Sequence, residues 1–305
     1  MPEIADGEVL VHVSHLAFDP SMKSWMENAV SYFPPTAIGD VMPGEGYGTV
    51  AASRNSEFEA GDAVTGFFGW QDFAAVRTAN LRRPPADIAP VAALSVLGSS
   101  GLTAFFGVFE IGRPRPGDVM LVSSAAGAVG SIAGQLGRIA GCRVTGIAGG
   151  DAKCDWLTRH LGFHDAIDRH HGDLDAQLER LAPQGVDVFF DNVGGQTLNT
   201  VLAHIARRAR IVICGGMSRH EEGRPPTVLD NYYNVVFERA RIEGFNVVDY
   251  RDRHPWAMGR LESWLRSGEI RYREPVVEGF DRAPAALMGV FAAASFGKQV
   301  LKISG

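Results

Sequence analysis

The stretch at residues 118–150 constrains the fold of this chain more than any other segment. A short apolar run at 119–123 leads into small residues at 124–129, a glycine-spaced segment at 130–140 and a second apolar run at 143–148. Apolar runs of this length are typical of buried parallel strands. A strand, a small-residue turn, a helix and a second strand make a βαβ unit of ordinary length. The pattern therefore predicts a parallel sheet covered by helices.

The small-residue turn suits the pyrophosphate of a dinucleotide. That group must approach the backbone closely at the positive N-terminal end of a helix. The G-x-G-x-x-G fingerprint falls here on Ala125, Gly127 and Gly130, so its first position is alanine. The flanking strands and the glycine-spaced helix strengthen this imperfect match. The alternative is a plain α/β crossover with a tight turn.

The end of the second apolar run indicates which dinucleotide is bound. Enzymes that use NAD usually place Asp or Glu there, to accept a hydrogen bond from the ribose 2′-hydroxyl. Here Ala148 is followed by Gly149 and Gly150, so no carboxylate stands where it would repel a 2′-phosphate. Lys153 offers a point charge suited to phosphate, and we interpret Asp151 as the N-cap of the next helix. These residues favour NADP(H) over NAD(H).

Composition narrows the class of protein. A chain of 305 residues suits two domains, and 46% hydrophobic with 21% charged residues is typical of a globular protein with an ample core. The net charge of −6 gives no reason to expect nucleic acid or an anionic membrane surface as a partner. No apolar run reaches the roughly 18 residues that span a bilayer, and residues 1–7 do not resemble a signal peptide. The three cysteines fit a reducing, cytoplasmic location.

The rest of the chain divides around this unit. Short strands with Gly and Pro punctuation at 8–76 indicate a compact β domain, and two helices are expected within 90–111. Strands then alternate with helices, which predicts a doubly wound, six-stranded parallel Rossmann sheet. The expected strands are 119–123, 143–148, 165–168, 186–191, 210–214 and 241–248, and the expected helices are 130–140, 151–161, 173–182, 195–206 and 229–237.

The C-terminal tail is too small to form its own domain. We expect helices at 254–267 and 281–294, a strand and turn at 271–280 and a final strand at 299–303. The economical interpretation is that this tail completes the first β domain. The predicted domains are therefore residues 1–95 with 260–305, a β-barrel substrate domain, and residues 96–259, a dinucleotide-binding domain.

Small or polar residues follow three of the later strands, where ligands sit on an open α/β sheet. They are Asp191–Asn192 with two glycines after them, the Cys214–Ser218 loop and Phe245–Val247. Glycines there let the backbone approach a flat ring, and Asn192 could hydrogen-bond a ribose or a carboxamide. Each segment alone could be a tight turn without a ligand.

The chain resembles the medium-chain dehydrogenase/reductases, in the zinc-independent branch of prostaglandin reductases, alkenal double-bond reductases and curcumin reductase. The matching segments are DPSMKSWM (19–26), AAGAVGSIAGQLGRIAGCRVTGIAGGDAKC (125–154), DNVGG (191–195), VICGGMS (212–218), ARIEGF (240–245) and GKQVLKI (297–303). The resemblance implies a GroES-like β domain around a Rossmann domain, with NADPH as cofactor. Members usually carry a further N-terminal segment, so the first domain is expected to be shortened.

The resemblance also implies which residues hold the cofactor. Gly127 to Ser131 would line the pyrophosphate, Lys153 would hold the 2′-phosphate next to Gly149, and Arg169 would replace a phosphate-binding Tyr. Ser295 stands where some relatives have a cofactor-binding Asn. The full set expected to bind NADPH is Gly127, Ala128, Val129, Gly130, Ser131, Gly149, Lys153, Arg169, Asn192, Cys214, Gly215, Gly216, Met217, Ser218, Phe245, Asn246 and Val247.

No metal site is expected. Zinc-dependent members of the superfamily need an early Cys and a His in a PGHE segment. The Asp19 region occupies the first position, and the second segment reads Pro43–Gly44–Glu45–Gly46. Hydride addition to a conjugated carbon–carbon double bond is then the expected reaction, on a small hydrophobic enone or enal. Met22, Trp25, Phe67 and Trp70 are candidates for its apolar lining.

Reduction of a conjugated carbonyl compound also needs a proton donor. Relatives place a Tyr in the segment before ARIEGF, and Phe237 stands there in this chain. Tyr47, Tyr233 and His220 are the candidate substitutes. Two alternatives stay open, a zinc-free quinone reductase and a catalytically impaired NADPH-binding protein. Relatives are commonly dimers, so a homodimer is expected.

Overall fold

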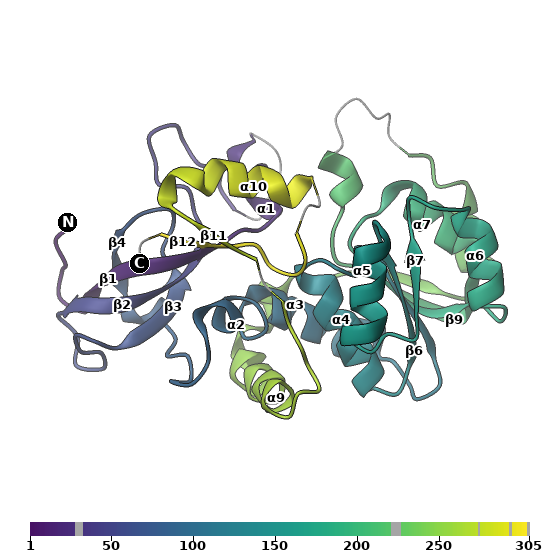
Figure 1. The fold of residues 1–305 in the computed structure, drawn as a ribbon, viewed down its shortest axis with the longest axis horizontal. Coiled ribbons are helices and arrows are strands. Elements are labelled where there is room, and N and C mark those ends of the chain that lie inside the picture. The colour runs from purple at the N-terminus through teal and green to yellow at the C-terminus, as the bar shows by residue number, and fades with distance from the viewer. Residues whose placement is uncertain (28–32, 221–226, 274, 293–294, 304–305) are drawn as a thin grey trace. The chain divides into compact units, whose positions relative to one another are not determined.

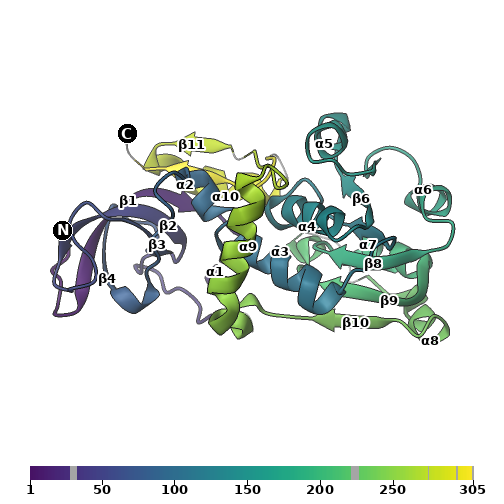
Figure 2. The same cartoon turned by 90° about the horizontal axis from the view of Figure 1, so that it is seen from below.

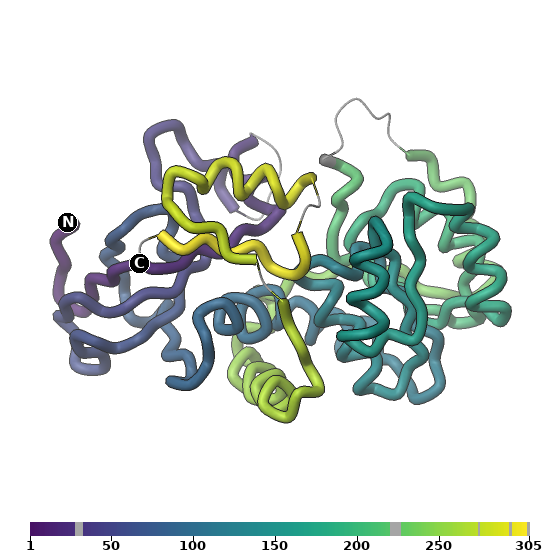
Figure 3. Tube along the Cα trace, in the orientation of Figure 1, coloured from purple at the N-terminus to yellow at the C-terminus, as the bar shows by residue number. Residues whose placement is uncertain are grey.

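The computed structural model describes residues 1–27, 33–220, 227–273, 275–292 and 295–303. The chain forms two compact units, residues 1–99 with 273–305 and residues 100–272. The sequence places the second division near residue 260, inside helix α9 (His254–Arg266). That helix belongs to the second unit because its buried Trp264 packs against Phe105 and Phe109 of the same unit, with ring centroids 6.2 and 6.0 Å apart. The path of the chain can be followed in Figure 3.

The second unit is built on a six-stranded parallel sheet. Its strands are β5 (Val119–Val122), β6 (Arg143–Ala148), β7 (Asp165–Asp168), β8 (Val186–Asp191), β9 (Ile205–Ile213) and β10 (Arg241–Gly244). They lie in the order β10-β9-β8-β5-β6-β7, so the first strand in sequence is central (Figure 1). This is the doubly wound order of dinucleotide-binding folds, and the predicted fold class is confirmed.

Helices cover both faces of this sheet. On one face α6 (Leu174–Leu181) and α7 (Gly195–Leu202) enclose a core that includes Leu121, Phe189 and Ile211. On the other face α4 (Ala128–Ile139) packs on β5 and β6, and the π-helix η2 (Gly107–Gly112) that continues α3 (Ser99–Phe106) packs on β8 and β9 (Figure 2). Because helices cover both faces, residues of the central strand β5 are apolar on either side, whereas the edge strands β7 and β10 carry charged residues.

Clear differences from the predicted element boundaries lie around β9 and β10. The predicted helix 195–206 ends at Leu202, because β9 begins at Ile205 and includes the exposed Arg207 and Arg208. The predicted strand 241–248 ends at Gly244. The Asn246 side chain accepts a hydrogen bond from the amide of Val248 at 3.1 Å and so caps the 3-10 segment η6 (Val247–Arg253).

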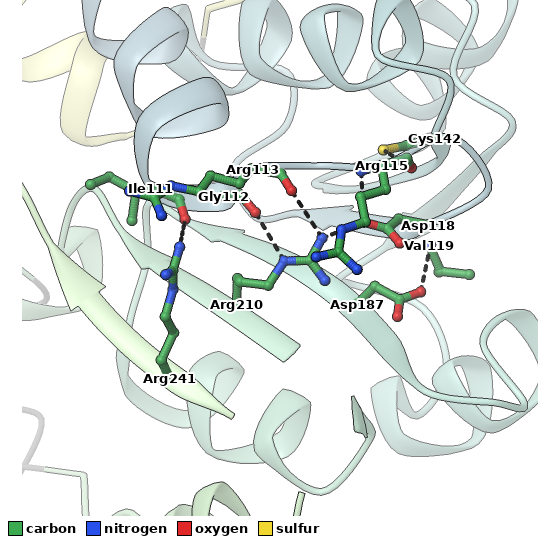
Figure 4. A network of polar contacts seen from close by, with 10 residues as sticks. All are labelled: Ile111, Gly112, Arg113, Arg115, Asp118, Val119, Cys142, Asp187, Arg210 and Arg241. Atoms are coloured by element: carbon green, nitrogen blue, oxygen red, sulfur yellow. Dashed lines mark hydrogen bonds and ion pairs between the residues drawn. The ribbon is translucent and has the colours of Figure 1, made fainter. Parts of the chain in front are cut away.

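A polar network fastens η2 to the sheet (Figure 4). The backbone turns after η2 at Arg113, which adopts a left-handed φ of 45°. Arg210 of β9 donates to the carbonyl oxygens of Gly112 at 3.0 Å and Arg113 at 3.3 Å, and it pairs with Asp118. Arg241 of β10 donates to the carbonyl oxygen of Ile111. The two guanidinium groups therefore satisfy carbonyls that a helix end leaves without intrahelical donors.

The first unit is a mostly antiparallel β domain. Its strands are β1 (Glu8–Ala17), β2 (Glu45–Ser53), β3 (Ala63–Phe67), β4 (Phe73–Arg77), β11 (Val276–Glu278) and β12 (Val300–Lys302). β1 pairs with β2 on one side and with β4 and β12 on the other, so the C-terminal strand lies against the N-terminal one (Figure 1). The fold of this unit agrees with the predicted GroES-like domain.

Short helices cover the sheet of the first unit. They are α1 (Ser21–Met26), α2 (Pro90–Leu94) and α10 (Ala283–Phe291). The predicted helix 281–294 extends into residues 293–294, which lie outside the described residues. No helix in the described part of the chain combines the length and apolar character that crossing a bilayer requires.

Candidate functional site

The turn between β5 and α4 has no room for a side chain at Gly130, the third position of the fingerprint. A Cβ on Gly130 would collide with the carbonyl oxygen of Ser124 and lie 3.0 Å from the Cα of Ala125. Gly127 is the N-cap of α4, and its carbonyl accepts from the Ser131 amide at 3.0 Å. The first amides of a helix have no intrahelical acceptor. The Gly127 amide donates to the Ser124 carbonyl, and the Ser131 amide donates to that of Gly127. The amides of Ala128, Val129 and Gly130 are therefore the ones in position for an anion.

Alanine at the first fingerprint position is accommodated by the neighbouring strand. Ala125 is fully buried after β5. Gly146 of β6 faces it, and a Cβ on Gly146 would lie 2.8 Å from the Cβ of Ala125 and 2.7 Å from Leu157. A glycine in the adjacent strand, Gly146, therefore makes room for the methyl group of Ala125, which stands where the fingerprint usually has a glycine.

The ends of β6 and β7 form a basic patch beside the turn. A Cβ on Gly149 would lie 3.0 Å from Nε of Arg169, which places that guanidinium over the end of β6. Lys153 lies on α5 (Asp151–Asp155); burial lowers the pKa of Lys153, and the positive charge of Arg169 lowers it further. Two cations that face one another in this way suit a phosphate between them. The N-cap of α5 is Gly150, not Asp151 as the sequence suggests.

Asp168 fixes the backbone of this patch. Its Oδ1 accepts from the amides of Gly150 at 2.8 Å and His170 at 2.9 Å. These backbone hydrogen bonds hold the pKa of Asp168 below its usual range. Oδ1 is therefore held by the backbone at the ends of β6 and β7, whereas Oδ2 is buried without a hydrogen bond to any described residue and lies 3.9 Å from Nε2 of His171. His170, for which the sequence predicts no part in cofactor binding, lies over Gly149 with its Nε2 2.7 Å from the ideal Cβ position.

A buried carboxylate organises the end of β8. Asp191 Oδ1 accepts from the Ser123 hydroxyl at 2.7 Å and from the amides of Val193 at 2.9 Å and Gly194 at 3.0 Å. Burial raises the pKa of Asp191, while these hydrogen bonds act in the opposite direction. Asn192 donates to the Ser123 carbonyl at 2.7 Å, so its amide is oriented by β5. Sequence reasoning chose Asn192 and missed Asp191 and Ser123.

The loop after β9 is fastened to the same network. The amides of Cys214 and Gly215 donate to the Asp191 carbonyl at 2.9 and 3.1 Å. The Met217 amide donates to the Asn192 carbonyl at 3.1 Å, and Ser218 donates to the Val193 carbonyl from both its amide and its hydroxyl. The predicted Cys214–Ser218 loop thus lies against the end of β8 at the carboxyl edge of the sheet.

The third predicted segment follows β10. Phe245 lies against α3–η2, because a Cβ on Gly107 would lie 2.7 Å from the Phe245 ring. Asn246 uses its side chain as the cap of η6, and the Val247 carbonyl interacts with His254 Nε2 at 3.0 Å. The Asn246 side chain is therefore held by the backbone amide two residues later. The backbone of Phe245–Val247 directly follows the end of β10.

The three candidate proton donors belong to different units, Tyr47 to the first and Tyr233 and His220 to the second. Tyr47 is half-buried in β2 of the first unit, where its ring meets His15 edge-on at 6.0 Å. Tyr233 ends the 3-10 segment η5 (Asp230–Tyr233) of the second unit, is 52% exposed, and contacts the Phe237 ring at 5.2 Å. His220 ends the 3-10 segment η4 (Met217–His220), and its side chain lies outside the described part.

The four residues of the predicted apolar lining all lie in the first unit but differ in exposure. Met22 and Trp25 belong to the buried core of the first unit, whereas Phe67 is 44% exposed. Trp70 is partly buried against that core and meets Phe18 edge-on at 5.3 Å. Of the four side chains, Phe67 is the one that the first unit leaves most accessible for a ligand.

Both carboxylates in the family's metal-binding segments are engaged by other groups. Asp19 Oδ2 lies 3.2 Å from Nζ of the buried Lys298. Glu45 pairs with Arg82 at 2.8 Å and accepts from the Ser99 amide at 3.1 Å. Across the described residues, no group of three or more His, Cys, Asp and Glu side chains has an arrangement that could hold a metal ion.

Comparisons with known proteins agree on the kind of protein. Residues 1–83 match the family described as the N-terminal domain of oxidoreductases, and residues 128–263 match the family described as zinc-binding dehydrogenases. The chain is 35% identical to the NADPH-dependent curcumin reductase of Escherichia coli K12, over 98% of this chain and 89% of that protein. It is 34% identical to the NADP(+)-dependent 2-alkenal reductase of Nicotiana tabacum, over 100% and 89%.

A solved structure extends the likeness to the fold. The crystal structure of CurA in complex with NADPH from Vibrio vulnificus matches with a TM-score of 0.94 and 36% identity. The match covers 100% of this chain and 92% of that one.

Proposed function

Because the chain belongs to the medium-chain dehydrogenase/reductases, in the branch of curcumin, prostaglandin and alkenal reductases, we propose that it is an NADPH-dependent reductase of α,β-unsaturated ketones and aldehydes that works without zinc. One observation carries the cofactor part of this proposal. The small-residue turn stands next to the end of β6, where Lys153 and Arg169 lie close to one another and where Ala148, Gly149 and Gly150 take the place of the usual carboxylate.

The residues present fit NADPH. The tight turn at Gly130 admits backbone close to a pyrophosphate, and the first turn of α4 supplies amide donors. Lys153 and Arg169 would hold the 2′-phosphate, and Asn192 with the Cys214–Ser218 loop would hold the nicotinamide half. When bound, NADPH supplies the hydride. The chain's own part is to fix the nicotinamide and the substrate in reacting distance and to exclude water.

The class of hydride acceptor is proposed from the names of the relatives and from the contacts of Asp19 and Glu45. The similar proteins are named for curcumin and for 2-alkenals. Asp19 and Glu45 are bound by cations of their own unit, which supports a reaction that does not rely on a metal Lewis acid. Addition of hydride to the β carbon places negative charge on the carbonyl oxygen, so a proton donor is needed there. Tyr47, Tyr233 and His220 are the proposed donors.

The test is NADPH consumption against a panel of enals, enones and quinones, with product analysis. We expect turnover with enals and enones that yields the saturated carbonyl compound. Turnover with quinones alone would make the protein a quinone reductase. NADPH binding without oxidation by any member would make it an impaired binding protein. Tyr47→Phe, Tyr233→Phe and His220→Gln variants then identify the donor by a loss of kcat at unchanged NADPH affinity.

The proposal includes location and assembly. A chain with three cysteines, Cys142, Cys154 and Cys214, fits a reducing cytoplasm. β10 is an edge strand with Ile242 41% exposed, and an exposed edge of this kind favours pairing with a second copy into a homodimer. Light scattering on the purified protein tests the dimer, and a mass of one chain would contradict it.

A further inference from the structure

His170 stands where a dinucleotide's ribose 2′ position is recognised. It follows the last residue pair of the β6–β7 ladder, in which Ala148 is opposite Asp168. An ideal Cβ on Gly149 would lie 2.7 Å from Nε2 and 3.2 Å from Cδ2 of His170. The imidazole edge therefore lies directly over the end of β6. In doubly wound folds, this strand end is the place that reads the 2′ substituent.

The position of the imidazole is set by backbone hydrogen bonds. The His170 amide donates to Asp168 Oδ1 at 2.9 Å, and the Arg169 amide donates to the Ala148 carbonyl at 2.8 Å. The same Asp168 oxygen accepts from Gly150 at 2.8 Å. These bonds tie the segment that carries His170 to the end of β6. The exposed ring can thus reach a ligand without a rearrangement of the loop.

We propose that His170, in its protonated form, is a third cationic donor to the 2′-phosphate beside Lys153 and Arg169. The inference rests on the proposed use of NADPH and adds a regulation of that site. Imidazole side chains gain their proton within about pH 5–8. The preference for NADPH over NADH therefore rises as the pH falls through this range, because only NADPH carries the phosphate that the imidazolium contacts.

The charged groups around His170 come from three segments. Asp168 of β7 lies beneath it, and the exposed His171 follows it with Nε2 3.9 Å from Asp168 Oδ2. The Arg169 side chain lies against Gly149, as that of His170 does. Asp151, Lys153 and Asp155 belong to α5. A phosphate monoester itself gains a proton near pH 6, which opposes the effect. A comparison of variants is therefore needed, since this contribution and any from Lys153 are shared by all of them.

The experiment measures the dissociation constants of NADPH and NADH by nucleotide fluorescence from about pH 5.5 to about pH 8.5, the range of imidazole titration. The variants are His170→Asn, His170→Lys and the matched control His171→Asn, whose side chain is on the neighbouring residue and faces Asp168. The quantity compared is the dissociation constant of NADH divided by that of NADPH. At the acid end of the range, we expect this ratio to be about fivefold higher in the native protein than in His170→Asn, as suits one charge-assisted contact. The two should converge at the alkaline end.

The other variants sharpen the outcome. His170→Lys keeps its charge, so it should hold the high ratio at alkaline pH, and His171→Asn should follow the native profile. A His170→Asn profile equal to the native one overturns the inference, as does an equal loss in His171→Asn. If the native protein shows no preference for NADPH at any pH, the proposed function itself fails. A preference that is present but identical in all variants overturns only the role of His170.

Discussion

Replacing Arg210 with methionine tests how the sheet of the second unit is held to η2. The Arg210 side chain is 16% exposed, and that of its partner Asp118 is 15% exposed. Its guanidinium reaches two consecutive carbonyls at the end of η2 as well as the carboxylate (Figure 4). Methionine keeps the apolar stem and removes the charge and all three contacts. The variant therefore isolates the polar contribution of one side chain.

The magnitude follows from burial. Breaking a buried ion pair costs about 3–5 kcal/mol when one charge is left behind. The loss here is reduced because Asp118 keeps the hydrogen bond from the Arg115 amide at 2.9 Å. We therefore expect Arg210→Met to lower the free energy of unfolding by about 3 kcal/mol, because two carbonyls also lose their charged donor. For a unit of this size, that corresponds to a fall in Tm of about 6–12 °C.

Arg143→Met is the matched control in the same sheet. Arg143 of β6 pairs with Asp165 at 2.9 Å, but the two side chains are 55% and 27% exposed. Exposed pairs contribute about 0–1 kcal/mol. Thermal unfolding followed by circular dichroism at equal pH and salt compares the variants. Equal Tm values for Arg210→Met and Arg143→Met would refute the reasoning, because the two differ mainly in burial and in the helix-end carbonyls.

Three further predictions concern the site and its surroundings. Gly130→Ala places a methyl group against the Ser124 carbonyl, so NADPH affinity measured by fluorescence should fall by at least about tenfold; native affinity would contradict the close approach. Asp191→Asn keeps an oxygen that can accept from Ser123 and Val193 but puts an amide donor in place of Oδ2, opposite the Gly194 amide, and should cost about 1–3 kcal/mol in urea unfolding together with weaker NADPH binding; unchanged stability would show that the network is dispensable. Burial raises the pKa of the Cys142 thiol to about 12. Unfolding releases its proton more easily, so this group makes the folded state lose stability as pH rises above about 8.5, and iodoacetamide at mildly alkaline pH should label it only after unfolding; rapid labelling of the folded protein would contradict this.

The sheet could be predicted because its strands are buried on both faces. The run 119–122 is continuously apolar, 186–191 is apolar apart from Asp187 and Asp191, and both runs are shorter than ordinary helices. β9 was found only in its second half. Its first half includes Arg207 and Arg208, and Arg208 adopts a positive φ of 63° at an irregularity in the pairing with β8. A local bulge with charged, exposed side chains leaves no periodic signal in the sequence.

The candidate site could be predicted where one segment forms it. The phosphate turn and the acid-free end of β6 are local features, and they appear in the sequence in their final order. Asp191, Ser123 and His170 were missed because their roles depend on contacts between strands. The sequence also could not show that Gly146 compensates for Ala125, since that contact joins residues of two adjacent strands. The candidates Tyr47 and Tyr233 belong to different units, so local sequence gave no geometry for them.

The most direct test of the account uses NADPH deuterated at the transferable C4 position of the nicotinamide. The protein is incubated with an α,β-unsaturated ketone, and the product is analysed by mass spectrometry and NMR. The account predicts a saturated ketone with deuterium at the β carbon. An allylic alcohol with deuterium at the carbinol carbon, or no deuterium transfer to any enone or enal, would contradict it.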